Sequence, residues 1–342
     1  MTEVEYGIVT GSAPSLQTVG NDIAYALNKL GHSAICTRYQ VPYYRAKKLF
    51  NRAIVFIPFD PLCSTAWFVM AKDYLKAGIP TVFYTTVEGI PKEKYIKDWY
   101  ASDLLYIANS EYTKEMMEKV NIPVSEIIYH GINLDHIAQS KPQKDLLKAK
   151  LNAKVVFGTV CSDLPRKGLK TLAQVTKLVE EELPDAKFYI LTKIMGRSYF
   201  TNTKNVVIDP RFGKLERQKV LSLIGSFDFY ICSSHAEGFG LPLLEAQAQG
   251  VPVICGEYKP LTEITTKETS LYVPIYDVRY QDDRYGILFS YHLYNPEDMA
   301  SKIKEAYEIY TCNQEKYHQM SQKAKEQAKK FNILDVYKEF IR

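Results

Sequence analysis

Two glutamates separated by a glycine-containing turn are the residues with the clearest capacity for chemistry. Glu237 and Glu245 lie eight residues apart, after an apolar run at 227–232 that is typical of a buried strand. Between them, Gly238 and Gly240 allow the backbone to turn tightly and to approach a ligand closely. A helix that starts after this turn would direct free N–H groups toward an anion. The pattern predicts a diphosphate site beside the two carboxylates.

A carboxylate accepts hydrogen bonds well from two neighbouring hydroxyl groups. Glu237 and Glu245, on either side of a diphosphate, could therefore hold a sugar at one end and a ribose at the other. The alternative is purely structural: Glu245 complements the helix dipole and Glu237 is solvated. The complete segment from Ser233 to Ala246 favours the functional interpretation. Pro242 is well placed in it as the first residue of a helix.

The elements that must position these residues alternate between short apolar strands and helices. One β-α-β series ends near residue 129, and a second begins at residue 155 after a polar, lysine-rich stretch at 139–145. This rhythm predicts an α/β protein with two Rossmann-like, doubly wound parallel-sheet domains facing a cleft. We predict a first domain at 1–147 and a second at 148–325. We expect a C-terminal helix at 326–342 to pack back on the first domain.

Ligands of such sheets bind beyond the carboxyl ends of the strands. Chemistry is therefore expected after four predicted strand ends: Thr10, Thr85, Val160 and Cys232.

Composition narrows the class of protein. The 342 residues carry a net charge of +4, which is too little to indicate a nucleic-acid partner. The six cysteines include no Cys-x-x-Cys pair, and no apolar run is long enough to cross a bilayer, so we expect a cytoplasmic protein. The basic run at 45–52 has two interpretations. A solvated helix face is favoured over peripheral contact with anionic lipid at the inner face of the membrane.

The segment from Ser233 to Ala246 resembles the Glu-x7-Glu signature of glycosyltransferase family 4, whose members are retaining enzymes with the GT-B fold. Further motifs agree with this family in the expected order and extend the resemblance over nearly the whole chain. They are Gly31-His32, Asn109-Ser110-Glu111-Tyr112-Thr113-Lys114, His130-Gly131-Ile132-Asn133 and Arg166-Lys167-Gly168-Leu169.

The resemblance implies a role for each matching residue. Glu237 would bind hydroxyls of the transferred sugar, and Glu245 would bind those of the ribose. Lys167, with Arg166, would neutralise the diphosphate, whose negative charge grows as the glycosidic bond breaks. Further substrate contacts are expected from Gly238, Phe239, Gly240, Leu241, Ser15 and Thr159.

Two positions near the expected phosphates depart from the family pattern. Pro14-Ser15 stands where many members carry a glycine pair, and Thr159 follows Gly158 where an arginine is common. We expect the loop at Ser15 to remain permissive, with free amides. Arg166 would supply the missing positive charge from a longer loop.

Glu88 stands at or near the position of a histidine that many members carry in the catalytic region. In one interpretation it positions the acceptor or the donor sugar, and in the other it is a surface carboxylate. We expect His130 to pack beneath the cleft rather than to catalyse. His235 lies beside the donor site and could simply cap the turn.

The resemblance implies transfer of a hexose from a UDP- or GDP-sugar to a hydroxyl of a glycan, lipid or protein, with retention at the anomeric carbon. No Asp-x-Asp occurs, so we expect neither a metal nor a cofactor besides the donor. Two alternatives stay open: a non-catalytic member that binds nucleotide sugar or glycan, and a nucleotide-sugar epimerase. The pattern does not identify the nucleotide base, the donor sugar or the acceptor, and it does not indicate the oligomeric state.

Overall fold

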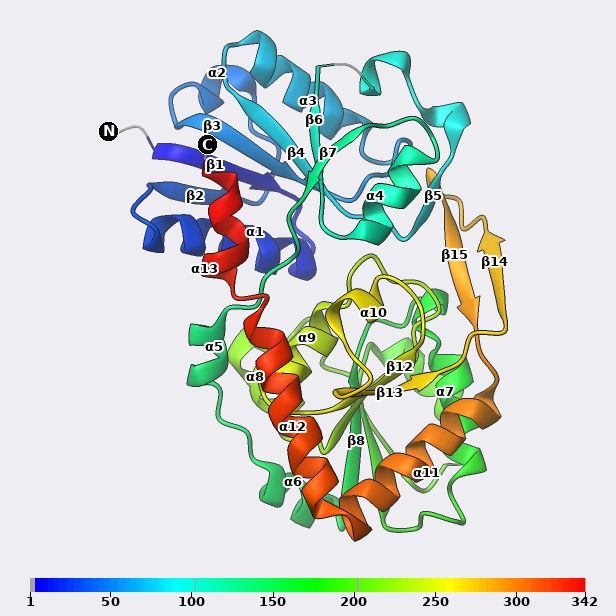
Figure 1. Cartoon of the computed structure of the whole chain (residues 1–342). Coiled ribbons are helices and arrows are strands. Elements are labelled where there is room, and N and C mark those ends of the chain that lie inside the picture. The colour runs from blue at the N-terminus through cyan, green and yellow to red at the C-terminus, as the bar shows by residue number, and fades with distance from the viewer. Residues whose placement is uncertain (1–3, 102, 202, 342) are drawn as a thin grey trace.

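The chain forms two lobes, each built around a parallel sheet of six strands (Figure 1). The computed structural model describes residues 4–101, 103–201 and 203–341. The first sheet has the order β2-β1-β3-β4-β6-β7 and the second has the order β10-β9-β8-β11-β12-β13. The two Rossmann-like parallel sheets predicted from the sequence are confirmed.

The strands of the first sheet are β1 (Val4–Thr10), β2 (Ala34–Thr37), β3 (Phe50–Phe56), β4 (Thr81–Thr85), β6 (Leu105–Ala108) and β7 (Val124–Ile127). Those of the second are β8 (Val155–Val160), β9 (Ala186–Leu191), β10 (Val206–Asp209), β11 (Phe229–Cys232), β12 (Val253–Gly256) and β13 (Ser270–Val273).

The helices of the first lobe are α1 (Pro14–Lys29), α2 (Tyr43–Ala46), α3 (Thr65–Lys76) and α4 (Glu111–Glu118). The linking segment contains α5 (Leu134–Gln139) and α6 (Lys144–Leu151). Then follow α7 (Leu169–Leu178), α8 (Arg217–Gly225), α9 (Leu241–Ala248), α10 (Leu261–Ile264), α11 (Pro296–Cys312), α12 (Gln314–Lys329) and α13 (Ile333–Val336). The 3-10 helices are η1 (Glu93–Tyr95), η2 (Asp98–Tyr100), η3 (Pro165–Lys167), η4 (Ile194–Phe200) and η5 (Tyr337–Phe340).

A third, antiparallel sheet was not predicted from the sequence. Strands β14 (Asp277–Gln281) and β15 (Ile287–Leu293) form a hairpin, and β15 also pairs with β5 (Gly89–Pro91) of the first lobe. The hairpin stands at one edge of the molecule and reaches from the second lobe to the first (Figure 1). Backbone hydrogen bonds therefore join the two lobes directly.

Two element boundaries differ from those expected, each for a local reason. Helix α1 begins at Pro14 rather than at residue 18, because proline is favoured in the first turn, where its missing N–H costs nothing. Strand β11 begins at Phe229 rather than Phe227. The ring of Phe227 fills the space beside Gly158, where a Cβ would lie 2.0 Å from that ring.

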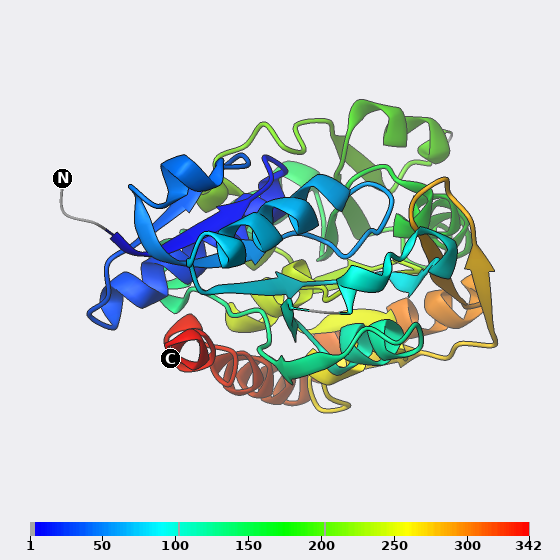
Figure 2. The same cartoon turned by 90° about the horizontal axis from the view of Figure 1, so that it is seen from above.

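The C-terminal segment crosses from one lobe to the other, as Figures 1 and 2 show. Helix α12 packs on α9, and the chain then forms a bridge between Asn332 and Ile132. Beyond it, Ile333, Tyr337 and Phe340 are buried in the core around α1. The predicted return to the first lobe is confirmed, and it is made by α13 and η5 after α12 has ended.

A buried carboxylate lies where the lobes meet. Asp22 of α1 accepts a hydrogen bond from Asn133 (Nδ2–Oδ1, 3.2 Å), and His136 Nδ1 lies 3.8 Å from the same oxygen. Burial raises the pKa of Asp22 to about 6, against the lowering effects of Asn133 and Arg217.

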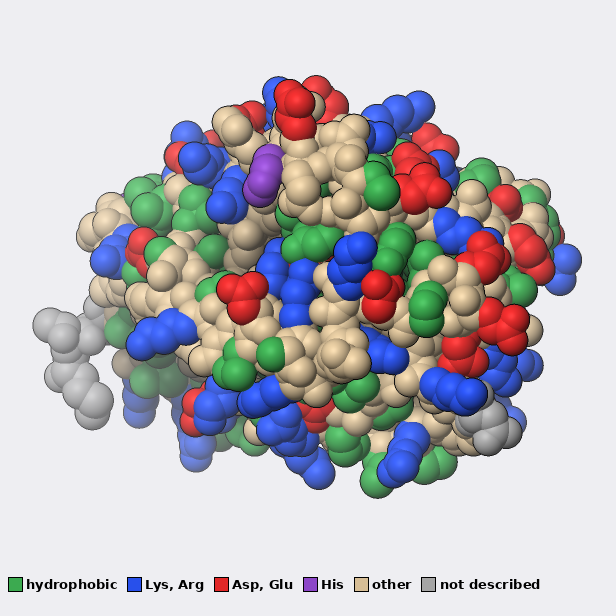
Figure 3. All heavy atoms as spheres, turned by 90° about the horizontal axis from the view of Figure 1, so that it is seen from below, with side chains coloured by type: hydrophobic (Ala, Val, Ile, Leu, Met, Phe, Trp, Pro, Cys, Tyr) green, Lys and Arg blue, Asp and Glu red, His purple; other side chains and the backbone are tan. Residues whose placement is uncertain are grey.

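The far end of the second lobe carries interspersed acidic and basic side chains rather than a field of one sign (Figure 3). In the first lobe, the basic run predicted at 45–52 lies on and after α2, where Tyr43 and Tyr44 are also exposed. Within the ranges that the structure describes, no helix has both the length and the apolar character needed to cross a bilayer.

The C-terminal crossing should depend on the hydroxyl of Tyr337, which accepts a hydrogen bond from Gly131 N at 3.0 Å in a fully buried site. Replacing Tyr337 by Phe leaves this N–H without its acceptor, so we expect a loss of about 1–3 kcal/mol in the free energy of unfolding. Urea denaturation measures this free energy of unfolding. Tyr276→Phe, at an exposed tyrosine, is the control. Equal stability of the two variants would contradict the assignment.

The stability of the junction should depend on pH through Asp22. Its native pKa of about 6 lies above the unfolded value of about 3.9, so the folded state holds a proton that the unfolded state releases between these pH values. This contribution is fully present below pH 4 and is lost as the pH rises through 6, a change of up to about 3 kcal/mol.

We therefore expect Asp22→Asn to raise Tm relative to the unmodified protein more at pH 8 than at pH 5. Exposed Asp145→Asn should show no such difference. Thermal unfolding at both pH values measures the effect. A Tm difference for Asp22→Asn that does not change with pH would refute the assignment.

Candidate functional site

A cavity of about 1210 Å³ lies between the lobes and is lined by residues of both. It lies beyond the carboxyl ends of β3 and β4 in the first sheet and of β8 and β11 in the second, as expected for doubly wound sheets. The cavity exceeds the range of roughly 300–1,000 Å³ that holds one drug-sized ligand. Its size suits a large ligand or two smaller ones.

The cations predicted from the sequence lie on a short turn after β8. Residues Pro165–Lys167 form the 3-10 helix η3, and Gly168 follows with a φ of +66° before α7 begins. A Cβ at Gly168 would lie 1.9 Å from the carbonyl oxygen of Ser233, so only glycine fits. His235 N also donates to Arg166 O at 2.7 Å. The turn is thereby fixed to the loop that carries Glu237.

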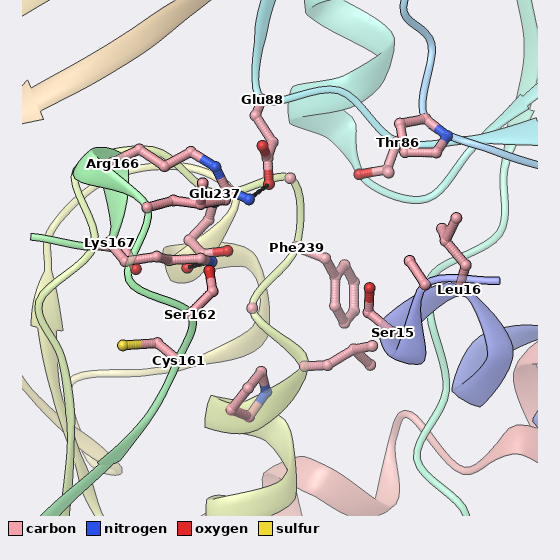
Figure 4. Close-up of a pocket in the computed structure, with 18 of the residues that line it drawn as sticks. Ser15, Leu16, Thr86, Glu88, Cys161, Ser162, Arg166, Lys167, Glu237 and Phe239 are labelled. Atoms are coloured by element: carbon pink, nitrogen blue, oxygen red, sulfur yellow. Dashed lines mark hydrogen bonds and ion pairs between the residues drawn. The ribbon is translucent and has the colours of Figure 1, made fainter. Parts of the chain in front are cut away.

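Four charged side chains alternate across the cavity. Lys167 Nζ donates to Glu237 Oε1 at 2.5 Å, and Arg166 Nη2 lies 2.9 Å from Glu88 Oε1. Figure 4 shows Glu88 extending from the first lobe toward Arg166, while Lys167 and Glu237 lie together on the second. Arg166 Nη1 also donates to the carbonyl of Ala236. The interpretation of Glu88 as a surface carboxylate is not compatible with this geometry.

The two carboxylates respond differently to this environment. Burial works against ionisation of Glu237, but Lys167 and Arg166 together outweigh it and hold its pKa below the usual range. For Glu88, burial dominates over the attraction of the same two cations, and the nearby charge of Glu237 adds to the effect, so its pKa is raised. Glu237 is therefore the more firmly ionised of the pair.

The glycine turn between the two signature glutamates fits tightly against the first lobe. A Cβ at Gly238 would lie 2.3 Å from Thr86 Oγ1, and Gly240 has a φ of +103°. Asn109 Nδ2 donates to Gly238 O at 3.3 Å. Thus the absence of a side chain at Gly238 lets the turn pass close to the other lobe, and Gly240 provides the positive φ that residues with a side chain rarely adopt.

The Asn-Ser-x-x-Thr motif joins the turn to the loop of Glu88. Thr113 Oγ1 donates to Asn109 Oδ1 at 2.7 Å and accepts from Val87 N at 3.2 Å. Because Asn109 also binds Gly238, one buried network holds both cavity loops. This accounts physically for a motif that the sequence identified only by resemblance.

Glu245 is buried at the opposite side of the turn and lines the same cavity. Its side chain is 4% exposed, and Arg217 Nη2 of α8 donates to Glu245 Oε1 at 2.5 Å. The proposal that Glu237 and Glu245 both border one cavity is therefore compatible with the structure. Arg217 itself was not predicted as a site residue.

Three helices begin at the cavity. Pro14 at the start of α1, Lys167 just ahead of α7 and Leu241 at the start of α9 line the cavity. None of the three helices has a side-chain cap. Ser15 lies in the first turn of α1 and faces the side chain of Phe239 (Figure 4). Uncapped helix starts leave N–H groups that favour anions.

The remaining predicted residues also lie here. Leu241 begins α9 and Thr159 lies near the end of β8, and both line the cavity together with Gly238, Phe239 and Gly240. Residues that the sequence did not indicate complete the wall: Phe212, Leu215, Asp283, Tyr285 and Phe289. For Asp283, Tyr285 and Phe289, the alternating, tyrosine-containing pattern at 277–293 was the sequence feature that could have indicated a hairpin.

The nearby histidines are packed against aromatic rings, and His130 also forms part of the cavity wall. His130 lies against the rings of Phe239 (4.9 Å) and Phe56 (5.3 Å), and burial lowers its pKa to about 3, so it is neutral at physiological pH. His235 stacks on Tyr294 and hydrogen-bonds Thr171 and the carbonyl of His292. His130 thus lies beneath the cleft as expected. His235 anchors its loop to β15 and α7.

Among the described residues, no group of three or more His, Cys, Asp or Glu side chains is arranged to hold a metal ion. The positive charge in the cavity comes from arginine and lysine side chains.

Comparison with known proteins agrees with the motifs. A family model described as glycosyl transferases group 1 matches residues 143–327. An uncharacterized glycosyltransferase of Sulfolobus islandicus rod-shaped virus 1 is 29% identical over 342 residues, covering 98% of each chain.

A second relative is a GDP-mannose-dependent monoacylated alpha-(1-6)-phosphatidylinositol monomannoside mannosyltransferase of Corynebacterium glutamicum. It is 28% identical over 193 residues, which cover 51% of this chain and 49% of that protein. Among solved structures, a glycosyltransferase from Rickettsia africae ESF-5 has a similar fold, with a TM-score of 0.71 over 99% of both chains at 17% identity. The chain belongs to the group 1 glycosyltransferases, glycosyltransferase family 4, and is a glycosyltransferase with the GT-B fold and a nucleotide-sugar donor.

Proposed function

We propose that this glycosyltransferase moves a hexose from a UDP- or GDP-sugar to a hydroxyl acceptor, with retention at the anomeric carbon and without a metal ion. The acceptor would approach from the lobe formed by residues 1–147, and residues 148–325 would bind the donor. The observation that carries the proposal is the alternating set of four charges, Glu88, Arg166, Lys167 and Glu237, beside three uncapped helix starts.

The diphosphate would bind Lys167 and Arg166 and the free N–H groups of the helix starts. The chain already binds one carboxylate in this way, since Glu263 accepts from the N–H groups of Glu111 and Tyr112 at the start of α4. Positive charge held in place beforehand would stabilise the diphosphate as it leaves. In other transferases a metal ion stabilises this negative charge.

The carboxylates would orient the two sugars of the donor. Glu237 would accept hydrogen bonds from hydroxyls of the transferred hexose, and Glu245, steadied by Arg217, would accept them from the ribose. The acceptor oxygen would attack the face from which the diphosphate departs, and a departing phosphate oxygen would take the acceptor proton. Retention then requires no nucleophile from the protein.

A thermal-shift panel of UDP, GDP, ADP and their sugars identifies the donor, because a ligand that binds only the folded state raises Tm. With that donor, we expect Glu237→Gln to lower kcat/KM for transfer by about 100-fold or more, since a charged hydrogen bond to the sugar is lost as the transition state forms.

Glu257→Gln, at a glutamate outside the cavity lining, is the matched control. A well-folded Glu237→Gln protein with undiminished transfer would remove the assignment. Donor binding without transfer to any acceptor in the unmodified protein would favour a non-catalytic, sugar-binding role instead.

Replacing Glu88 by Gln should strengthen binding of the free nucleoside diphosphate. The substitution releases Arg166 from its ion pair and removes a negative charge close to the phosphates. A change in Kd on the order of tenfold at low salt is expected.

Calorimetric titration of Glu88→Gln and Glu88→Asp with the same diphosphate measures this change. Glu88→Asp retains the charge and should bind like the unmodified protein. Weaker or unchanged binding to Glu88→Gln would show that Glu88 does not compete with phosphate for Arg166.

A further inference from the structure

One group of the residues that line the cavity forms a part of its wall that we call the outer pocket. Its walls come from α3 and the loop before it, which contribute Trp67 and Cys63, and from the hairpin of β14 and β15, which contributes Asp283, Arg284, Tyr285 and Phe289. Neither the signature glutamates nor the cationic turn lies in this part. The outer pocket is therefore free for a ligand other than the donor.

The hairpin turn belongs to the second lobe in sequence but is fastened to the first. Gly286 N donates to Asp60 Oδ1 at 2.9 Å, and Lys92 N donates to Gly286 O at 2.8 Å. Lys92 Nζ also donates to Asp282 Oδ1 and to Tyr285 O, each at 2.6 Å. These contacts form the wall of the outer pocket before any ligand arrives, which lowers the entropic cost of binding.

The carboxylate of Asp283 is oriented by neutral groups. Gln281 Nε2 donates to its Oδ1 at 2.7 Å and Tyr291 OH donates to its Oδ2 at 3.2 Å. Across the part of the chain that the structure describes, no lysine, arginine or histidine forms an ion pair with Asp283. The carboxylate is thus held in place, and its remaining lone pairs are available to hydroxyl donors.

Aromatic side chains accompany this carboxylate. Trp67, Tyr285 and Phe289 all line the outer pocket, and the rings of Tyr285 and Phe289 meet edge to face with centroids 5.7 Å apart. Aromatic rings offer large apolar surfaces that can cover the C–H face of a sugar ring, while the carboxylate binds the hydroxyls at its rim. This combination suits a neutral polyol with one apolar face.

The charges around the cavity argue against an anionic acceptor. Four described cations line it: Arg166, Lys167, Arg217 and Arg284. Three of them pair with carboxylates of the proposed donor site, and only Arg284 belongs to the outer pocket. A phosphate or carboxylate placed here would face Asp283, with the exposed Arg284 to compensate it, because Lys92 in the wall is already paired with Asp282.

We propose that the outer pocket is the acceptor subsite and that the acceptor is a pyranose residue, with Asp283 binding two of its neighbouring hydroxyls. This inference rests on the proposed transfer function. A third hydroxyl oxygen of the acceptor forms the new bond to the anomeric carbon as the bond between that carbon and the diphosphate oxygen breaks. The acceptor proton passes to the departing diphosphate, so charges and atoms balance.

The test uses the donor found by thermal shift and four classes of acceptor: methyl α- and β-pyranosides of glucose, mannose and galactose, glycerol 3-phosphate, n-octanol, and a Ser/Thr peptide. We expect transfer to at least one pyranoside in preference to the other classes. For that pyranoside, Asp283→Asn should raise the acceptor KM at least tenfold and leave the donor KM within twofold.

Asp277→Asn is the matched control, because Asp277 lies on the same hairpin, pairs with Arg279 and does not line the cavity. Preference for the phosphate, the alcohol or the peptide overturns the inference, as does an unchanged acceptor KM in Asp283→Asn. If no acceptor reacts, saturation-transfer NMR of the diphosphate-saturated protein decides, and the absence of any pyranoside signal overturns it.

These outcomes separate the inference from the function on which it rests. Donor turnover with no role for Asp283 refutes only the acceptor subsite. Failure of every nucleotide and nucleotide sugar to raise Tm refutes the proposed donor site, and the acceptor subsite with it.

Discussion

The partly buried, alternating charges of Glu88, Arg166, Lys167 and Glu237 are the constraint on which the site depends. Removing one member would leave its partner without a compensating charge, at a cost below the roughly 3–5 kcal/mol of a fully buried pair, because these side chains keep some contact with solvent. In the structure, Glu88 and Glu237 pair with the two cations that a diphosphate would bind. In the proposed function, donor binding would be an exchange of partners, in which phosphate oxygens replace carboxylate oxygens and no cation is left unpaired.

Strand β15 holds the two carboxylate loops at a fixed spacing. Ser290 N donates to the carbonyl of Glu88 at 3.2 Å, and His292 N donates to that of His235 at 2.8 Å. Residues two apart in a strand are separated by about 7 Å, so the loops from the two lobes are held at roughly this distance. A movement that opens the lobes must break the pairing of β15 with β5 or carry the hairpin with the first lobe.

Local sequence was enough to select four charged residues that the folded structure brings to the cavity. Arg166 and Lys167 lie on a turn after a strand, Glu237 lies in the loop after another strand, and Glu245 lies in the helix that follows. Glycine and proline mark these turns in the sequence. The parallel sheets followed from apolar strands alternating with helices, whose spacing is likewise local. Glu88 could be placed beside the cleft because it follows a strand end, although its ion pair with Arg166 could not be anticipated.

The outer half of the cavity depends on contacts between distant parts of the chain. The pairing of Phe289 with Gly89 joins strands from different lobes, and nothing in either segment specifies the other. Arg217 is one of several charged residues near the start of α8, and only the packing of α8 on α9 shows that it meets Glu245. The hairpin and Arg217 therefore required the folded structure.

A crystal structure of the protein with its nucleoside diphosphate bound would test the partner exchange most directly. We expect phosphate oxygens within hydrogen-bonding distance of Lys167 Nζ and the Arg166 guanidinium, and displacement of at least one of the carboxylates of Glu237 and Glu88. A diphosphate bound elsewhere, or bound here while both ion pairs keep their unliganded distances, would contradict it.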